Sequence, residues 1–469
     1  MNSKLVSLFC CLIMLVSFSG CTKVTQLVKD NQPTKAELLA EINEEHQRWE
    51  AAPAADPTPY LRHYDDPADA QKYFDYVTDT YSEYDAAKEL SLEEAEEDVN
   101  YLFDAFYYDF AFYDYFGGHT VFDQAKAEIL QELQAKDNLT CKDLQEVLVK
   151  HLTFIKDGHF NINHNFPAEK EIPFFFRQVM FVKTDSGYQD SNGKTVVSVD
   201  GHPDLDALFK RSISKEGYLV YYPVLLKKAK FDGTEWDKHV CDEQLTVHYA
   251  DGSTDVLTAD TWSQYYKDLP KGQNTDLRQT DGIPVFQFNS FDGSFLQEVN
   301  AAAAQMSDAA ISMLDLRSNV GGYEEVAHQW FNRYSHQRVF DTGVRYSVLP
   351  ASLVASPSTS KTPRASNDNI LILLSGKCSA SCAEITLDLS YNLDNSLIIG
   401  ENTNGSMISN SGHIELPNSK CSVDMTFSTV YLTPDGSDYF EELRGFFPDI
   451  WVPAKEAETL AAKLMENLK

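Results

Sequence analysis

Basic residues are scarce in this chain: 39 Lys and Arg stand against 71 Asp and Glu, which gives a formal net charge of −32 at pH 7. Proteins that bind nucleic acid place Lys and Arg against the phosphates. Because a surplus of carboxylates repels phosphates, we exclude nucleic acid as a partner. Part of the charge lies in residues 91–98, where a charged helix face is the expected explanation.

Cysteine is sparse as well. So few cysteines cannot form a disulfide framework, and no pairing follows from their positions. With 43% hydrophobic and 12% aromatic residues the chain has a globular composition, so a large core has to hold the fold. Beyond position 21 there are five cysteines, namely Cys141, Cys241, Cys378, Cys382 and Cys421.

Sequence motifs for metal ions are missing too. The chain contains neither HExxH nor a pair of CxxC motifs. His159 and His164 are five residues apart on a predicted strand and turn, which does not make a metal site. We therefore predict no metal ion and no cofactor.

The N-terminus predicts export. Lys4 is followed by an apolar stretch, Leu5–Phe18, that suits a signal peptide over residues 1–20 better than a membrane span. The segment ends in Phe18-Ser19-Gly20-Cys21, which resembles the cleavage box of bacterial lipoproteins, although Leu, Val or Ile is usual in place of the phenylalanine. The resemblance implies a lipid anchor on Cys21, hence an exported lipoprotein of the cell envelope. Secretion without lipid is the alternative.

Two regions with different patterns follow the signal peptide. Residues 21–60, with the runs NQP and AAPAADPTP, are typical of a tether with helical patches. Residues 61–165 are rich in Glu, Ala, Leu and aromatics, with helical spacing at Phe122–Leu133 and Cys141–Leu152. We expect a helical domain there.

Residues 166–270 change to short strands separated by turn signals and predict a β-rich domain. Within it, Gly193–Leu208 indicates a strand, an Asp-Gly turn and the start of a helix. This order resembles part of a PDZ-type module, and a generic β-rich domain fits nearly as well.

In residues 271–469 predicted strands and helices alternate, which is typical of an α/β layer architecture. The predicted strands are Ile283–Phe291, Ala310–Leu316, Ile370–Leu374 and Ser396–Gly400, and the predicted helices are Leu296–Met306, Glu324–Tyr334 and Cys382–Leu393.

The segment Ile370–Gly405 carries the clearest chemical signal. Its buried strand leads through a turn of small residues, 375–381, into a helix. A serine at such a turn exposes its hydroxyl, and unpaired backbone N–H groups at the positive end of the helix dipole can hold an oxyanion. The alternative is an ordinary turn in which small residues allow tight packing.

Three further segments are polar turns next to strands or helices. Leu314–Gly322 ends in two glycines, which let a backbone N–H group approach a reacting carbonyl. Lys156–Phe160 carries His159, and Glu442–Val452 begins with an acid and ends in a strand. Taken singly, each segment could equally be an ordinary surface turn.

Taken together and in this order, the segments resemble one family of serine peptidases. The family includes the carboxy-terminal-processing peptidases, the tricorn core protease and the interphotoreceptor retinoid-binding protein. The resemblance covers roughly the last two thirds of the chain and rests on six matches in order. They are DGH (157–159), FQFNSF (286–291), LDLRSNVGG (314–322), SASCAE (379–384), GENTNGS (400–406) and GFFPDIWV (445–452).

The resemblance implies a ClpP/crotonase-like α/β core and assigns roles to individual residues. In this family the nucleophile stands three residues before the motif glutamate, which here makes Ser381 the nucleophile before Glu384. Backbone N–H groups of Cys382 and of Gly321 or Gly322 would form the oxyanion hole.

The two branches of the family use different general bases, and the sequence matches only one of them. The processing peptidases use a lysine at the position of Ser406, and no lysine lies between Asn395 and Ile414. The tricorn branch instead uses a histidine that matches His159, together with a glutamate that matches Glu442. The serine that precedes this histidine in tricorn is Gly158 here, so one relay partner is missing, and Asp157 or water could replace it.

These residues predict a lipid-anchored serine endopeptidase that acts on peptides or unfolded proteins. The family also contains non-proteolytic members that carry apolar ligands, and the glycine in the relay favours such a binding protein as the alternative. Retention of the serine, the histidine and both glycine-bearing turns favours the enzyme. The sequence does not predict an oligomeric state.

Overall fold

A computed structural model describes residues 24–50, 55–72, 75–230, 238–265, 273–347, 364–407, 409–434 and 439–468. The predicted signal peptide over residues 1–20 and the predicted lipidation site Cys21 lie outside these residues. Within the described part of the chain, no helix combines the length and apolar character that a membrane span requires.

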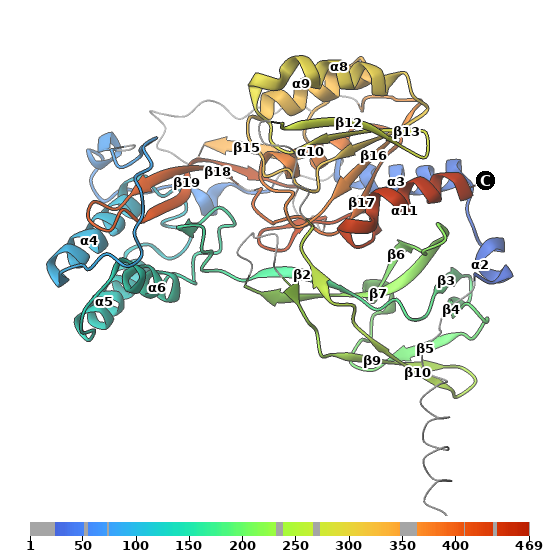
Figure 1. Ribbon diagram of the computed structural model, residues 1–469, viewed down its shortest axis with the longest axis horizontal. Helices are drawn as coiled ribbons and strands as arrows, with labels where there is room; N and C mark the ends of the chain where they lie inside the picture. The colour runs from blue at the N-terminus through green and yellow to red at the C-terminus, as the bar shows by residue number, and fades with distance from the viewer. Residues whose placement is uncertain are drawn as a thin grey trace, which may run out of the picture.

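A six-stranded sheet forms the centre of the C-terminal half (Figure 1). Its spatial order is β12-β13-β14-β16-β17-β22; β12 runs antiparallel to β13, and the other neighbours are parallel. The strands are β12 (Thr275–Thr280), β13 (Ile283–Phe288), β14 (Ile311–Asp315), β16 (Ile370–Ser375), β17 (Ser396–Gly400) and β22 (Ile450–Trp451). The α/β class predicted for this region is confirmed, and every predicted strand is present.

Alternating apolar residues of the strands pack into two cores, one on each face of the sheet, as the period of two in a strand requires. Leu371 and Leu373 of β16 face one core, whereas Ile372 and Leu374 face the other. The first face is covered by α8 (Leu296–Ser307), η3 (Gly293–Phe295), α9 (Glu324–Ser335) and α10 (Cys382–Ser390). The second face is covered by α3 (Lys35–Glu50) and α11 (Ala454–Asn467).

The helix α3 lies inside the segment that the sequence predicted to be a tether. Its residues Leu38 and Ile42 are buried against the central sheet, and Arg211 forms ion pairs with Glu41 and Glu45. A tether would make no such contacts, so this part of the prediction does not match the structure. The rest of the segment contributes α2 (Gln26–Asp30) and η1 (Thr58–Tyr60).

The middle of the chain is β-rich, as predicted, and its sheets share one apolar core around Phe174, Phe181 and Val247. The expected strand, Asp-Gly turn and helix appear in order as β5 and α7. The Ser212 hydroxyl donates to the Trp451 carbonyl at 2.6 Å and ties this part to the central sheet. The elements are β2 (Lys170–Phe175), β3 (Phe181–Thr184), β4 (Gly187–Asp190), β5 (Val196–Val199), α7 (Leu205–Leu208), β6 (Phe209–Ile213), β7 (Leu219–Ala229), β8 (Lys238–His239), β9 (Gln244–Tyr249), β10 (Thr254–Thr258) and β11 (Trp262–Ser263).

The three helices of the predicted helical domain, α4, α5 and α6, pack against strands from the last quarter of the chain (Figure 1). Side chains of the hairpin β18–β19, including Val423 and Met425, complete the core of α4, α5 and α6. The short strand β1 pairs with β19, so it lies beside this hairpin. These elements are η2 (Asp69–Lys72), α4 (Leu92–Asp109), α5 (Gly118–Gln134), α6 (Cys141–His151), β1 (Asn161–Ile162), β15 (Val344–Ser347), β18 (Ser409–Glu415), β19 (Ser422–Leu432), β20 (Phe440–Glu441) and β21 (Gly445–Phe446).

Candidate active site

Ser381 stands at the junction between the buried strand β16 and the helix α10, as the N-cap of that helix. Its backbone has φ 54° and ψ −117°, a conformation that L-residues rarely adopt. The side chain is partly exposed, whereas every residue of α10 is buried. The fold therefore presents one hydroxyl at a strained turn on top of a fixed helix.

The two-glycine turn lies directly against this serine. Gly321 has φ 105°, and a Cβ atom there would lie 2.9 Å from Ser381 Cβ and 3.1 Å from the Cys382 nitrogen. Only glycine allows this approach. The turn and the start of α10 are thus in contact, as an oxyanion hole between them requires.

The structure separates the two glycines that the sequence left as alternatives. The Gly321 N–H donates to Asn319 Oδ1 at 2.8 Å, and the buried Asn319 amide donates to the Phe288 carbonyl at 2.8 Å. Among the described residues, the Gly322 N–H has no such acceptor. Gly322 is therefore the better candidate for the second oxyanion donor.

Glu384 is fully buried and connects the serine turn to the loop 403–406. One carboxylate oxygen accepts the N–H groups of Ser381 at 3.0 Å and Ser406 at 2.9 Å. The other accepts the Gly405 N–H at 2.7 Å and the Thr403 hydroxyl. The sequence analysis used Glu384 only as the motif glutamate after Ser381; the structure shows that its carboxylate holds the serine turn and a second loop in place.

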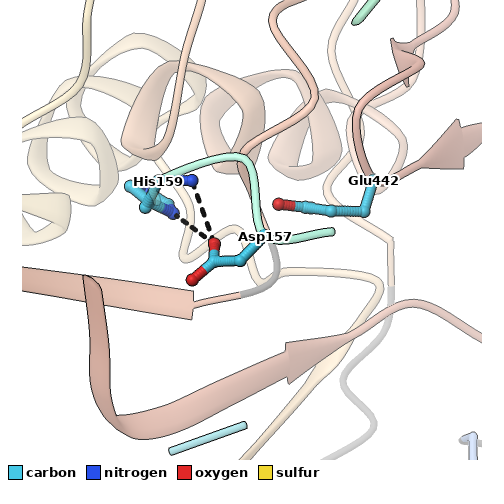
Figure 2. A group of neighbouring side chains, drawn as sticks. All are labelled: Asp157, His159 and Glu442. Carbon is cyan, nitrogen blue, oxygen red and sulfur yellow. Dashed lines mark hydrogen bonds and ion pairs between the residues drawn. The ribbon is translucent and has the colours of Figure 1, made fainter. Parts of the chain in front are cut away.

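His159 lies in the turn between α6 and β1, with one tenth of its side chain exposed. Asp157 accepts the His159 backbone N–H at 2.9 Å, and the same carboxylate oxygen lies 3.8 Å from His159 Nδ1 (Figure 2). The other oxygen of Asp157 accepts the Thr426 hydroxyl at 2.6 Å. The buried aspartate therefore faces the imidazole from the Nδ1 side.

Glu442 reaches the same turn from the opposite end of the chain. Its carboxylate points toward Asp157 and His159 in Figure 2, and it accepts the Gly158 N–H at 2.8 Å. It is half-buried and is not the solvated loop acid that the sequence left open. This hydrogen bond joins Glu442 to the turn of His159 across 284 residues of the chain.

The histidine turn packs on the same loop that Glu384 holds. A Cβ atom at Gly158 would lie 2.1 Å from the Gly405 carbonyl oxygen and 2.7 Å from Ser406 Cβ. The serine turn, through Glu384, and the histidine turn, through Gly158, thus both contact the loop 403–406. The packing also explains why glycine, and not serine, precedes the histidine: no side chain fits there.

We expect Gly158→Ala and Gly158→Ser to destabilise the protein, each by about 1–3 kcal/mol, because the added carbon would lie 2.1 Å from the backbone carbonyl oxygen of Gly405. Urea unfolding measures the loss. Gly293→Ala is the matched control, since a Cβ atom there meets nothing within 4 Å. Equal stabilities of the Gly158 and Gly293 variants would contradict the tight packing described above.

The comparisons with known proteins agree with this geometry. Residues 282–452 match the family model described as Peptidase family S41. This segment belongs to that family. The chain is accordingly a serine-type peptidase. The matched segment contains the serine turn, the two-glycine turn and Glu442, and His159 lies outside it.

Solved structures similar to this peptidase are remote in sequence, and at such identities the likeness concerns the fold alone. No curated protein sequence matches the chain. The structure of mature CPAF is similar at 12% identity with a TM-score of 0.43, covering 80% of this chain and 96% of that chain. The photosystem II D1 C-terminal processing protease has 13% identity, a TM-score of 0.36, and coverage of 80% and 99%. The tricorn protease has 12% identity, a TM-score of 0.34, and coverage of 80% and 37%.

Two buried lysines beside the site were missed by the sequence reasoning. Lys170 stands between Glu169 and Glu171, a pattern typical of a solvated surface, yet none of it is exposed. Lys377 is 2% exposed and donates to backbone carbonyls of residues 403 and 444. Burial lowers the pKa of Lys170 to about 8 and that of Lys377 to about 7. No feature of the sequence distinguished them from surface lysines.

Two groups of side chains could hold a metal ion by their spacing, although the sequence predicted no metal site. In the described part of the chain these are Asp157, His159 and Glu442, and Glu324, His328 and Asp341. Within each group the ligand atoms lie within 4.8 Å of one another. The first group also contains His159 and Glu442, which the sequence predicts to form the proton relay, with Asp157 or water in place of the missing serine.

In the part of the chain that the structure describes, the cysteines are thiols and form no disulfide. Cys378 and Cys382 flank the serine turn and are buried, as expected of small turn residues. Gln264 donates to Cys378 Sγ at 2.8 Å, which joins this turn to the β-rich part.

Proposed function

We propose that this chain is an exported, lipid-anchored serine endopeptidase with Ser381 as nucleophile and His159 as general base. The observation that carries the proposal is the contact of the serine turn and the histidine turn with one loop, residues 403–406, through Glu384 and Gly158. The lipid anchor on Cys21 and export rest on the N-terminal sequence alone.

In the proposed reaction the Ser381 hydroxyl attacks the carbonyl carbon of a peptide bond. His159 Nδ1 lies 3.8 Å from the Asp157 carboxylate, which puts a negative charge beside the imidazolium that forms when Nε2 takes the serine proton. Gly322 and Cys382 donate N–H groups to the oxyanion that forms on the carbonyl oxygen. His159 then protonates the leaving amine, and water hydrolyses the acyl-enzyme on Ser381 by the same path in reverse.

Glu442 contributes by fixing the turn that carries the base. Its carboxylate accepts the N–H of Gly158, the residue directly before His159. We assign it the orienting role in this relay, with Asp157 in the place that the missing serine leaves.

The proposed substrate is an extended peptide or unfolded protein. Val320 and Tyr323, which flank the two glycines, are 63% and 72% exposed. Large apolar side chains exposed beside a reactive turn favour contact with apolar residues of a substrate chain. Such a chain would bind as an added strand.

Labelling with a fluorophosphonate probe tests this proposal. The protein from Thr22 onward is treated with the probe and digested, and the modified peptide is identified by mass spectrometry, with Ser381→Ala and His159→Ala alongside. We expect an adduct on Ser381 of the wild type that is lost in both variants, because the probe reacts only with an activated serine.

The other outcomes are equally informative. An adduct that persists in His159→Ala would assign the base to another residue. No adduct on folded wild-type protein would favour the alternative, a binding protein on the same scaffold.

A further inference from the structure

The backbone directly before His159 is held by charged groups of opposite sign. The Gly158 N–H donates to the Glu442 carboxylate at 2.8 Å. The Gly158 carbonyl, which belongs to the peptide bond to His159, accepts from Lys170 Nζ at 3.2 Å. A carboxylate on the N–H side and an ammonium on the C=O side are the charges that each dipole favours.

Lys170 reaches this carbonyl from the first residue of β2 and is enclosed on all sides. Its ammonium also donates to Asn404 Oδ1 and lies 4.3 Å from the centre of the Phe166 ring. Asn404 Oδ1 in turn accepts the Ser406 hydroxyl at 3.1 Å. One amine therefore joins the histidine turn to the loop that Glu384 ties to Ser381.

A buried lysine is costly, since burial disfavours the charged form. Burial lowers the pKa of the Lys170 ammonium, and the negative charges of Glu384, Glu442 and Asp157 oppose that shift. All three of these acids belong to the proposed site. A buried ammonium among these three acids indicates that Lys170 has a role in the site, because a lysine that serves only solubility is exposed.

We propose that Lys170 is a positioning residue for His159, whose ammonium fixes the Gly158 carbonyl and thereby holds the imidazole in one orientation. The inference rests on the proposed role of His159 as the base. Lys170 does not act as the base itself, because its contacts are with Gly158, Asn404 and the Phe166 ring.

Lys377 provides a matched comparison. It is buried to the same degree as Lys170, its pKa is also lowered, and it donates to carbonyls of Thr403 and Arg444. Its bonds hold the backbone of the loop and do not reach the histidine turn. Replacing either lysine by methionine removes a buried charge of the same kind, and only Lys170→Met releases the Gly158 carbonyl.

The test uses protein labelled with ¹⁵N-histidine, because imidazole ¹⁵N shifts report the tautomer and protonation of His159 without any turnover. Signals of His159 are assigned by their loss in His159→Gln. In Lys170→Met we expect them to shift or split, and the rate of fluorophosphonate labelling to fall about 100-fold, as for a misplaced catalytic group. In Lys377→Met we expect unchanged His159 signals, because Lys377 holds the loop and the serine turn and does not contact the histidine turn.

Unchanged His159 signals in Lys170→Met would overturn the inference, and so would equal changes in both lysine variants, since these would reflect general loosening. If the wild type is not labelled, and its His159 signals still change in Lys170→Met, the proposed function is rejected. The positioning of His159 by Lys170 is then still supported. If Lys170→Met does not fold, Lys170→Gln replaces it. Its shorter side chain cannot reach the Gly158 carbonyl, so the same change is expected.

Discussion

Replacing Ser381 by glycine is expected to abolish peptide hydrolysis and to stabilise the folded protein in the same step. The loss of the nucleophile should lower kcat/KM by at least about 10⁴-fold. The gain follows from the backbone, because a non-glycine residue at φ 54° and ψ −117° carries strain of about 1–3 kcal/mol. Glycine loses about 0.5–1 kcal/mol through the greater freedom of the unfolded chain, so a net gain of about 1 kcal/mol remains.

Ser381→Ala is the control that separates the two effects. Alanine removes the hydroxyl and keeps the Cβ atom, so it should be as inactive as glycine without the gain in stability. Hydrolysis of a fluorogenic peptide mixture and urea unfolding measure both quantities. Alanine and glycine variants of equal stability would show that the turn is relaxed, and hydrolysis at the wild-type rate by either would place the nucleophile elsewhere.

This strain belongs to a part of the chain whose secondary structure the sequence predicts well. The helix predicted over Glu324–Tyr334 extends over Glu324–Ser335, and the helix predicted from Cys382 begins there. The apolar run Ile370–Leu374 becomes the buried strand β16. A continuous apolar run or a regular helical spacing allows only one secondary structure that buries the apolar side chains. The local sequence pattern is therefore sufficient to predict these elements.

The parts that were not predicted depend on contacts between distant segments. The helix α3 carries Leu38 and Ile42 within a run rich in Glu, and this composition hides how deeply the two side chains are buried. The hairpin β18–β19 completes the core of helices some 300 residues earlier in the chain, as in the bond from the Asn418 N–H to Asp98. The hydrophobic periodicity of one segment does not reveal which distant segment of the chain packs against it.

In the candidate site, too, the sequence predicted the residues but not the contacts between distant segments. The resemblance placed Ser381, His159 and Glu442, and the turns that carry them contact one loop in the structure. It read Gly158 as a defect, because spacing along the chain does not reveal that Gly405 and Ser406 fill the space of a side chain. The choice between Gly321 and Gly322 likewise needed the hydrogen bond from Gly321 to Asn319.

Glu384→Gln is expected to destabilise the protein by about 3 kcal/mol or more and to lower kcat/KM about 100-fold. Each oxygen of this buried carboxylate accepts from two donors, with Ser381 and Ser406 on one oxygen, and Thr403 and Gly405 on the other. A glutamine turns one oxygen into an amide NH₂, which donates and cannot accept. Whichever way the amide is turned, two buried donors lose their acceptor and face another donor.

Glu401→Gln is the matched control on the neighbouring strand end. Glu401 is 2% exposed, and its oxygens accept one donor each, from the Trp262 indole and the Ala454 N–H. Burial raises the pKa of Glu401 to about 7, so the neutral form, which an amide resembles, is accessible near neutral pH. A glutamine there loses at most one bond, and we expect a cost of about 1 kcal/mol.

Urea unfolding and fluorogenic peptide hydrolysis compare the two glutamine variants under identical conditions. Because Glu384 joins the serine turn to the loop that supports the histidine turn, its loss should affect hydrolysis even where the protein remains folded. The Glu401 carboxylate contacts neither turn, since its partners are the Trp262 indole and the Ala454 N–H, so its variant should hydrolyse at close to the wild-type rate. If Glu384→Gln proved as stable and as active as Glu401→Gln, the loop 403–406 would hold its position without the carboxylate, and the proposed coupling of the two turns through Glu384 would be wrong.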